Sequence, residues 1–286
     1  MKAMRTWLGM LLVAGCYAPS FPTGAPCGTN DACPSALVCV STTHTCERPS
    51  GALADGPTMD VSARGDGGAD APGDGPTGPP MATFLGHGQA STDGATAALV
   101  LSTSVPIAAF LVAEIAARGA LPISVADSRG NTWRKAVEID NASTTEVAGV
   151  YYCSVSVAMG VGDTITATVT TASSNTRAIA VFQLTNITAL DQIGSARTSG
   201  TAPSVTTTGA VTASNELLFA VIATGHNAAE TFVPGAGFTE VYEFGSGLSS
   251  GSFNQRNGAS LSGPQTFTAT TTAASASHAT VIATFR

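Results

Sequence analysis

The chain has 286 residues, of which 44% are hydrophobic and only 11% are charged, and its formal net charge is −7. An acidic chain without basic clusters lacks the electrostatic attraction on which nucleic-acid binding and adsorption to anionic lipid depend. We therefore expect no nucleic-acid partner, and any attachment to a membrane has to be covalent.

The first predicted element is a secretory signal peptide over residues 1–15. Lys2 and Arg5 precede an apolar run at residues 7–14, which is far too short to span a membrane. A small Ala-Gly pair then directly precedes Cys16. This arrangement resembles the lipobox of bacterial lipoproteins, in which the signal is cut before a cysteine that then carries lipid. The resemblance implies a Gram-negative outer-membrane lipoprotein, displayed at the surface or in the periplasm and anchored through a lipid on Cys16.

Residues 16–49 form a predicted cysteine-rich module. Its other cysteines follow the spacing C-x5-C-x5-C-x6-C and are Cys27, Cys33, Cys39 and Cys46. So short a segment cannot bury a core, so we expect two disulfides, in one of three connectivities, in an oxidising compartment. Close C-x2-C pairs are absent and His44 is a single imidazole, so we expect no metal. The module resembles the small cysteine modules that follow the lipobox in secreted Gram-negative proteins.

Residues 50–82 are predicted to be a disordered linker. Gly, Pro and Asp alternate there almost without large apolar side chains. Such a segment cannot offset the entropy lost on ordering by burying surface. The linker would separate the cysteine-rich module from whatever follows it.

From residue 83 to the end, the pattern predicts an all-β domain. Short runs such as residues 150–157 and 164–169 alternate in polarity and are separated by turn-forming residues. In the first run, Tyr151, Cys153, Val155 and Val157 share one face, which we expect to be buried. Cys153 is then a packed thiol rather than a nucleophile.

The β region also contains an internal repeat. The segments TITATVTTAS (164–173) and TFTATTTAAS (266–275) are identical at seven of ten positions. Two further pairs follow in the same order: 130–133 with 235–238, and 111–119 with 217–225. We predict a jelly-roll-like β-sandwich built from two similar halves, about 83–190 and 191–286; two tandem sandwiches are the alternative. The repeat also predicts a strand, not a helix, at residues 109–118.

The repeat segment 130–133 belongs to a predicted turn. The sequence VADSRGNTW (125–133) resembles the V-x-D-x-x-G-N-x-[WY] turn of β-sandwich modules in secreted and cell-surface bacterial proteins. The resemblance implies a surface module without an assigned chemistry. Gly130 suits a positive φ, and Asp127 and Asn131 suit Asx turns; a calcium site is the alternative.

No catalytic set is evident in the sequence. The motif GLSSG (247–251) matches the G-x-S-x-G pattern, but no acid follows it, so we interpret it as a mobile loop. Glu138 aligns with Glu243 across the repeat, and such acids could form the carboxylate pair of a glycosidase. We expect no catalytic residue and no cofactor.

Exposed aromatic rings are the usual platforms for sugars. Most rings of this chain lie in strand patterns that favour burial, and the possible ligand contacts are Trp133, Tyr152, Tyr242 and Phe253. The sequence thus favours a non-catalytic β-sandwich module that binds a glycan or a protein. The alternative is a polysaccharide-acting hydrolase that uses acids such as Glu138 and Glu243.

Overall fold

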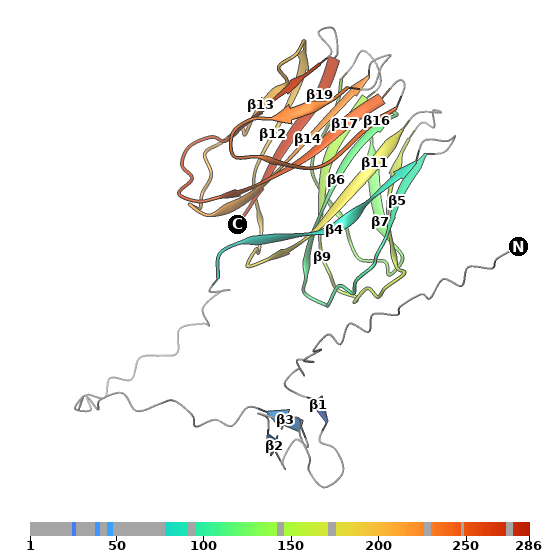
Figure 1. Cartoon of the computed structure of the whole chain (residues 1–286), viewed down its shortest axis with the longest axis vertical. Helices are drawn as coiled ribbons and strands as arrows, with labels where there is room; N and C mark the ends of the chain where they lie inside the picture. Colours follow the sequence, from blue (N-terminus) through green and yellow to red (C-terminus); the bar gives the residue numbers. More distant parts are fainter. Residues whose placement is uncertain are drawn as a thin grey trace, which may run out of the picture. The chain divides into compact units, whose positions relative to one another are not determined.

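The computed structural model describes part of the chain. The described residues are 25–26, 38–40, 45–47, 78–90, 95–141, 146–170, 176–225, 230–246, 249–272 and 277–286. They belong to two compact units, Met1–Gly68 and Ala69–Arg286 (Figure 1). The predicted signal peptide, Cys16, Cys27, Cys33 and nearly all of the linker lie outside the described residues.

In the first unit, three short strands form an antiparallel sheet in the order β1-β3-β2. They are β1 (Ala25–Pro26), β2 (Val38–Val40) and β3 (Thr45–Glu47). Cys39 of β2 lies directly opposite Cys46 of β3, and Cys39 is disulfide-bonded. The disulfide connectivity of the module remains a prediction.

Eight strands are described in the first half of the second unit. They are β4 (Met81–Ala90), β5 (Thr96–Val100), β6 (Phe110–Arg118), β7 (Ile123–Asp127), β8 (Arg134–Asp140), β9 (Glu146–Ser154), β10 (Thr164–Val169) and β11 (Arg177–Thr185). They form a five-stranded sheet, β4-β11-β6-β9-β8, and a three-stranded sheet, β5-β10-β7.

The described strands of the second half repeat this arrangement. They are β12 (Leu190–Ser199), β13 (Ser204–Thr206), β14 (Glu216–Gly225), β15 (Phe232–Pro234), β16 (Thr239–Ser246), β17 (Ser249–Gly258), β18 (Thr266–Thr271) and β19 (Ser277–Phe285). The sheet orders β12-β19-β14-β17-β16 and β13-β18-β15 match those of the first half strand for strand. The predicted all-β fold with two similar halves is therefore confirmed.

The two halves stack into four layers (Figure 1). Within each half, a buried core separates the three-stranded from the five-stranded sheet. A third core, which includes Phe182, Phe219 and Phe253, lies between the two five-stranded sheets and belongs to both halves. Each half is thus a two-sheet sandwich of its own, and the shared core joins the two.

Burial follows from this layering. The strands of the three-stranded sheets have one face in solvent, so β5 and β18 alternate between buried and exposed residues. The central strands β6 and β14 are covered on both faces and are buried almost throughout. That double burial explains why residues 109–118 are apolar except for Glu114 and Arg118, and the segment forms a strand as predicted.

A long antiparallel ribbon gives the first half its jelly-roll character. In the first half, the pairing of β5 with β10 continues through the Val105–Met159 bridge into the pairing of β6 with β9. The ribbon keeps one register while it passes from the three-stranded to the five-stranded sheet. At the corner of this ribbon, the start of β8 lies beside the end of β9 and close to the segment that follows β9.

The structure corrects one register in the predicted repeat. β10 and β18 begin where the sequence match placed them, and Ile165 and Phe267 are both buried. At β6 and β14, however, Phe110 and Leu217 both face the shared core, so the prediction that paired Leu111 with Leu217 was wrong by one residue. A strand buried on both faces lacks the polar alternation that would fix its register.

Candidate functional site

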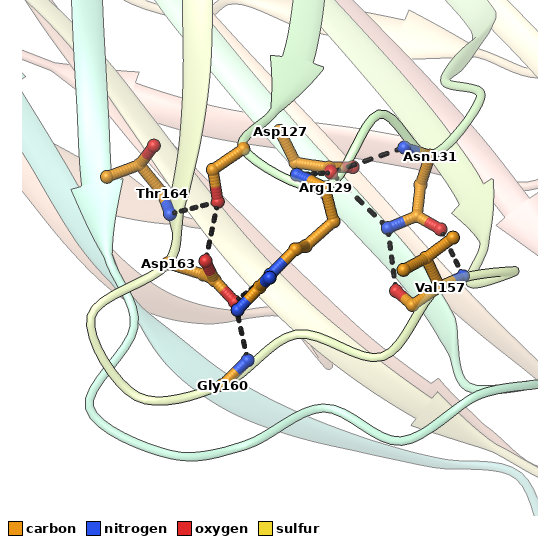
Figure 2. Close-up of polar contacts among 8 residues, drawn as sticks. Asp127, Arg129, Asn131, Val157, Gly160, Asp163 and Thr164 are labelled. Carbon is orange, nitrogen blue, oxygen red and sulfur yellow. Dashed lines mark hydrogen bonds and ion pairs between the residues drawn. The ribbon is translucent and has the colours of Figure 1, made fainter.

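The predicted turn at 125–133 is closed by hydrogen bonds to the side chain of Asp127. Asp127 Oδ1 accepts from the amides of Arg129 at 2.8 Å and Asn131 at 3.2 Å, and Gly130 has φ +74° (Figure 2). Asp127 Oδ2 accepts from the Trp133 indole at 2.8 Å. Because N–H donors occupy these carboxylate oxygens, the geometry is that of the predicted Asx turn.

The side chain of Asn131 links this turn to the segment that follows β9. Its Oδ1 accepts from the amides of Ser156 at 2.8 Å and Val157 at 2.7 Å, and its Nδ2 donates to the Val157 carbonyl at 3.0 Å (Figure 2). Asn131 is itself buried. The positions of Thr132 and Ser156 relative to each other are therefore fixed by one amide side chain.

Asp163 closes the other side of this turn. Its carboxylate accepts from Ser128 Oγ at 2.8 Å, Arg129 Nε at 2.7 Å and the Gly160 amide at 2.6 Å. The bond from Arg129 is the main reason why the pKa of Asp163 is lowered. The turn between β7 and β8 is thus tied to the loop between β9 and β10 (Figure 2).

Beside the turn at 125–133 lies a hollow of about 300 Å³, which we call the Tyr152 hollow. Its lining residues are Phe110, Thr132, Arg134, Tyr152, Ser154, Ser156 and Thr188. Thr188 belongs to the segment that connects the two halves. The volume is at the lower end of the range for small-molecule sites.

Two aromatic residues, Phe110 and Tyr152, line the Tyr152 hollow. The rings of Tyr152 and Phe110 are parallel within 6° with centroids 5.7 Å apart, and each meets Phe285 of the second half at an edge. Tyr152 is half-buried, whereas Phe110 is buried. The Tyr152 ring is thereby packed against two other rings, while the residue stays partly accessible.

The polar groups of the hollow are mostly unengaged. Within the described part of the chain, no hydrogen bond engages the side-chain hydroxyls of Thr132, Ser154 and Tyr152. All the Ser and Thr residues of the lining are exposed. Arg134 lies directly opposite Tyr152 in the pairing of β8 with β9. The hollow thus offers a ring, hydroxyl groups and a cation to a ligand.

A second, more open hollow lies on the other face of β8, around Trp133. Its polar groups already bind one another: the indole donates to Asp127, Lys135 Nζ lies 2.7 Å from Glu138 Oε1, and the Tyr151 hydroxyl donates to Glu138 Oε2 at 2.6 Å. A ligand there would have to displace these bonds. Of the two predicted ligand contacts Trp133 and Tyr152, Tyr152 therefore has more neighbouring polar groups that are free to bind a ligand.

The other two predicted ligand contacts are packed against protein. Tyr242 stacks on His87 of β4 with ring centroids 3.7 Å apart, and its hydroxyl is hydrogen-bonded to Gln89. Phe253 is completely buried in the shared core. The prediction that Phe253 is an exposed platform was wrong, because the face of β17 that bears it is covered by the first half.

Glu138 and Glu243 occupy equivalent places in the two halves, as the repeat predicted. Glu138 Oε2 accepts from the amide of Ile123, the first residue of β7, and Glu243 Oε2 accepts from that of Phe232, the first residue of β15. Burial opposes the ionisation of Glu138, but bonds from Lys135 and Tyr151 outweigh it and lower its pKa. Each carboxylate thus ties a five-stranded sheet to the neighbouring three-stranded sheet.

These two acids do not meet. β8 packs against β12 and β19, whereas Tyr242 of β16 stacks on β4, so β8 and β16 lie at opposite edges of the stacked sheets. Four strand spacings of about 4.8 Å separate those edges, or roughly 19 Å. A glycosidase pair needs roughly 5–10 Å. Glu138 and Glu243 therefore cannot form one catalytic pair.

Two other pairs of acids are neighbours. Asp191 and Glu216 interact near Arg286, and Glu240 interacts with Glu243. Both pairs belong to the second half, and neither lines the Tyr152 hollow.

Ser249 of the GLSSG motif is not in a mobile loop, contrary to the prediction. Ser249 and Ser250 are buried at the start of β17. Ser249 Oγ donates to Glu146 Oε2 at 3.1 Å, and burial raises the pKa of Glu146 to about 9. A protonated carboxyl cannot accept the proton of a nucleophilic serine, so this contact is structural.

Cys153 is buried within the first half, as predicted, and is a free thiol. Burial raises its pKa to about 11, which disfavours the reactive thiolate. Val157, predicted on the same buried face, is instead 47% exposed because β9 ends at Ser154.

Comparison of the chain with protein-family models, curated proteins and solved structures gave no match. Among the described residues, no helix is long and apolar enough to cross a membrane. Those residues also contain no group of three or more His, Cys, Asp or Glu side chains placed to hold a metal ion.

Sequence reasoning missed most of the Tyr152 hollow. It did not single out Phe110, Arg134, Ser154 or Thr188, which come from four different segments. The Ser-x-Ser spacing at 154 and 156 is the only local signal, and it is common in a chain so rich in serine.

Proposed function

We propose that this protein is a non-catalytic saccharide-binding module of an exported lipoprotein. The half-buried Tyr152 ring beside free hydroxyl groups carries the proposal. A rigid ring offers an apolar surface to the C–H face of a sugar, and nearby hydroxyls fix the orientation of its polar groups. The separation of Glu138 from Glu243 favours binding over the hydrolase alternative.

The test is binding of oligosaccharides to the mature protein, measured by calorimetry. Tyr152→Ala removes the ring, and we expect it to weaken saccharide binding at least about tenfold. Tyr242→Ala is the matched control, because it removes the same kind of ring from β16, where Tyr242 stacks on His87 outside the hollow, and it should leave the affinity unchanged. An unchanged affinity in Tyr152→Ala, or a lost one in Tyr242→Ala, would contradict the assignment of the site.

The localisation part of the proposal rests on the N-terminal sequence. The apolar run before Cys16 supports export and lipidation at that cysteine, and the Gly/Pro/Asp segment 50–82 would let the sandwich extend from the membrane. The net charge of −7 supports a covalent anchor rather than electrostatic adsorption.

Cys16→Ser should abolish lipid labelling and move the protein from the membrane fraction to the soluble fraction. A single lipid-bearing residue accounts for the anchor, so no other substitution should be needed. Cys153→Ser is the control, since that thiol is buried and should leave fractionation unchanged. Retention of Cys16→Ser in the membrane fraction would overturn the anchor.

A further inference from the structure

Arg134 differs from the other basic side chains in the described part of the chain. Four of these form ion pairs with acids, Arg129, Lys135, Arg197 and Arg286, and Arg118 Nε lies 3.7 Å from the buried carboxyl group of Glu146. Arg256 lies over the Phe238 ring, and Arg177 has a partner as well. The Arg134 guanidinium has neither an acid nor a ring nor a hydrogen-bond partner within the described residues.

The surroundings of Arg134 leave its charge uncompensated. The lining of the Tyr152 hollow contains no Asp or Glu. In an acidic chain whose other described Arg and Lys side chains all have partners, a guanidinium without one beside a hollow is an available anion site. A guanidinium presents a planar fork of donors that matches a carboxylate or sulfate group.

The second half provides an internal comparison. Arg134 and Tyr152 are cross-strand partners, and the equivalent partners in the second half are Thr239 and Gln255. The duplicated position thus has neither the cation nor the ring. The pair of charge and ring belongs to the first half, where the hollow lies.

From this geometry we infer that the ligand of the Tyr152 hollow is an acidic saccharide whose carboxylate or sulfate group pairs with Arg134. The sugar ring would lie on Tyr152, and Thr132 and Ser154 would bind its hydroxyl groups. The inference rests on the proposed function and adds the chemical class of the ligand to it.

The experiment compares oligosaccharides that share one backbone and differ only in charge. Suitable probes are oligogalacturonate, its carboxyl-reduced neutral form, and a sulfated form of that neutral chain. Binding of each to the mature protein is measured by calorimetry at low and high salt. We expect an acidic form to bind about tenfold more tightly than the neutral form, with the difference shrinking as salt rises.

Arg134→Gln should erase this preference and leave the weaker binding of the neutral form in place. Arg197→Gln is the matched control: it removes the same charge from a half-exposed side chain that pairs with Asp140 and lies outside the hollow. It should keep the full preference. The relative affinities of the uronate and the sulfated form identify which anion the site accepts.

The outcomes separate the two proposals. Equal binding of neutral and acidic forms, with Tyr152→Ala still abolishing both, would overturn the acidic ligand and keep the saccharide site. Failure of every saccharide to bind would overturn the proposed function itself. Inorganic sulfate or acetate binding as tightly as the acidic saccharide would reduce the site to a simple anion site and overturn both.

Discussion

At the scale of single residues, Glu114 is the least expected group in the structure. It lies in the middle of β6 and is completely buried, and neither carboxyl oxygen has a hydrogen-bond partner within the described residues. Burial raises its pKa well above the usual value, and the nearby backbone amides of Asn254 and Ala220 offset this only in part. Burial therefore favours the protonated form of this carboxyl in the folded protein.

This protonation makes stability depend on pH. In the unfolded chain Glu114 ionises near its ordinary pKa, so between that pH and the raised pKa of the folded state the folded protein binds more protons and loses stability as pH rises. The slope for one such group is at most about 1.4 kcal/mol per pH unit. We expect Glu114→Gln, which has the shape of the protonated acid, to stabilise the protein at pH 8 and to flatten the dependence.

Urea denaturation at several pH values between about 3 and 8 measures this effect. Glu138→Gln is the control with the opposite sign, because the pKa of Glu138 is lowered and its contribution is lost at low pH. Parallel stability curves for the wild type and Glu114→Gln would contradict the assignment.

At the scale of elements, the sequence was informative where strands have one face in solvent. The alternation in β10 and β18 placed both strands and their register correctly. β6 and β14 are covered on both faces, and there the pattern of polar and apolar residues gave a register that was wrong by one residue. Alternation of polar and apolar residues marks which face of a strand is in water, so it cannot distinguish the two faces when both are buried.

The same limit applies to the candidate site. The turn at 125–133 was predictable because its bonds join neighbours in the sequence. The Tyr152 hollow was not, because the corner of the ribbon and the connecting segment assemble it from distant residues. The errors at Phe253 and Ser249 have one cause: nothing local indicates that the other half covers them.

At the scale of the whole molecule, one close contact between the two halves depends on a glycine. A Cβ added to Gly251 of β17 would lie 2.8 Å from the Ala116 Cβ of β6 and 2.6 Å from the Phe244 ring. Both neighbours are buried in the shared core, where little can shift.

We expect Gly251→Ala to destabilise the protein by about 1–3 kcal/mol through overpacking, which corresponds to roughly 2–4 °C in Tm for each kcal/mol. Calorimetry of thermal unfolding measures the shift. Gly160→Ala is the control, because the nearest atom to its added Cβ is 3.8 Å away. A Tm for Gly251→Ala that matches the control would show that the halves can separate at this point without cost.

The shared core has a further consequence, because equivalent surfaces of the two halves face each other across it. Glu146 at the start of β9, for example, contacts Ser249 at the start of β17. This is the geometry of an isologous homodimer, here enclosed in one polypeptide. In a dimer of identical chains, every substitution appears in both copies of a site at once. Covalent duplication removes that constraint, so one half could acquire Arg134 and Tyr152 while its twin kept Thr239 and Gln255.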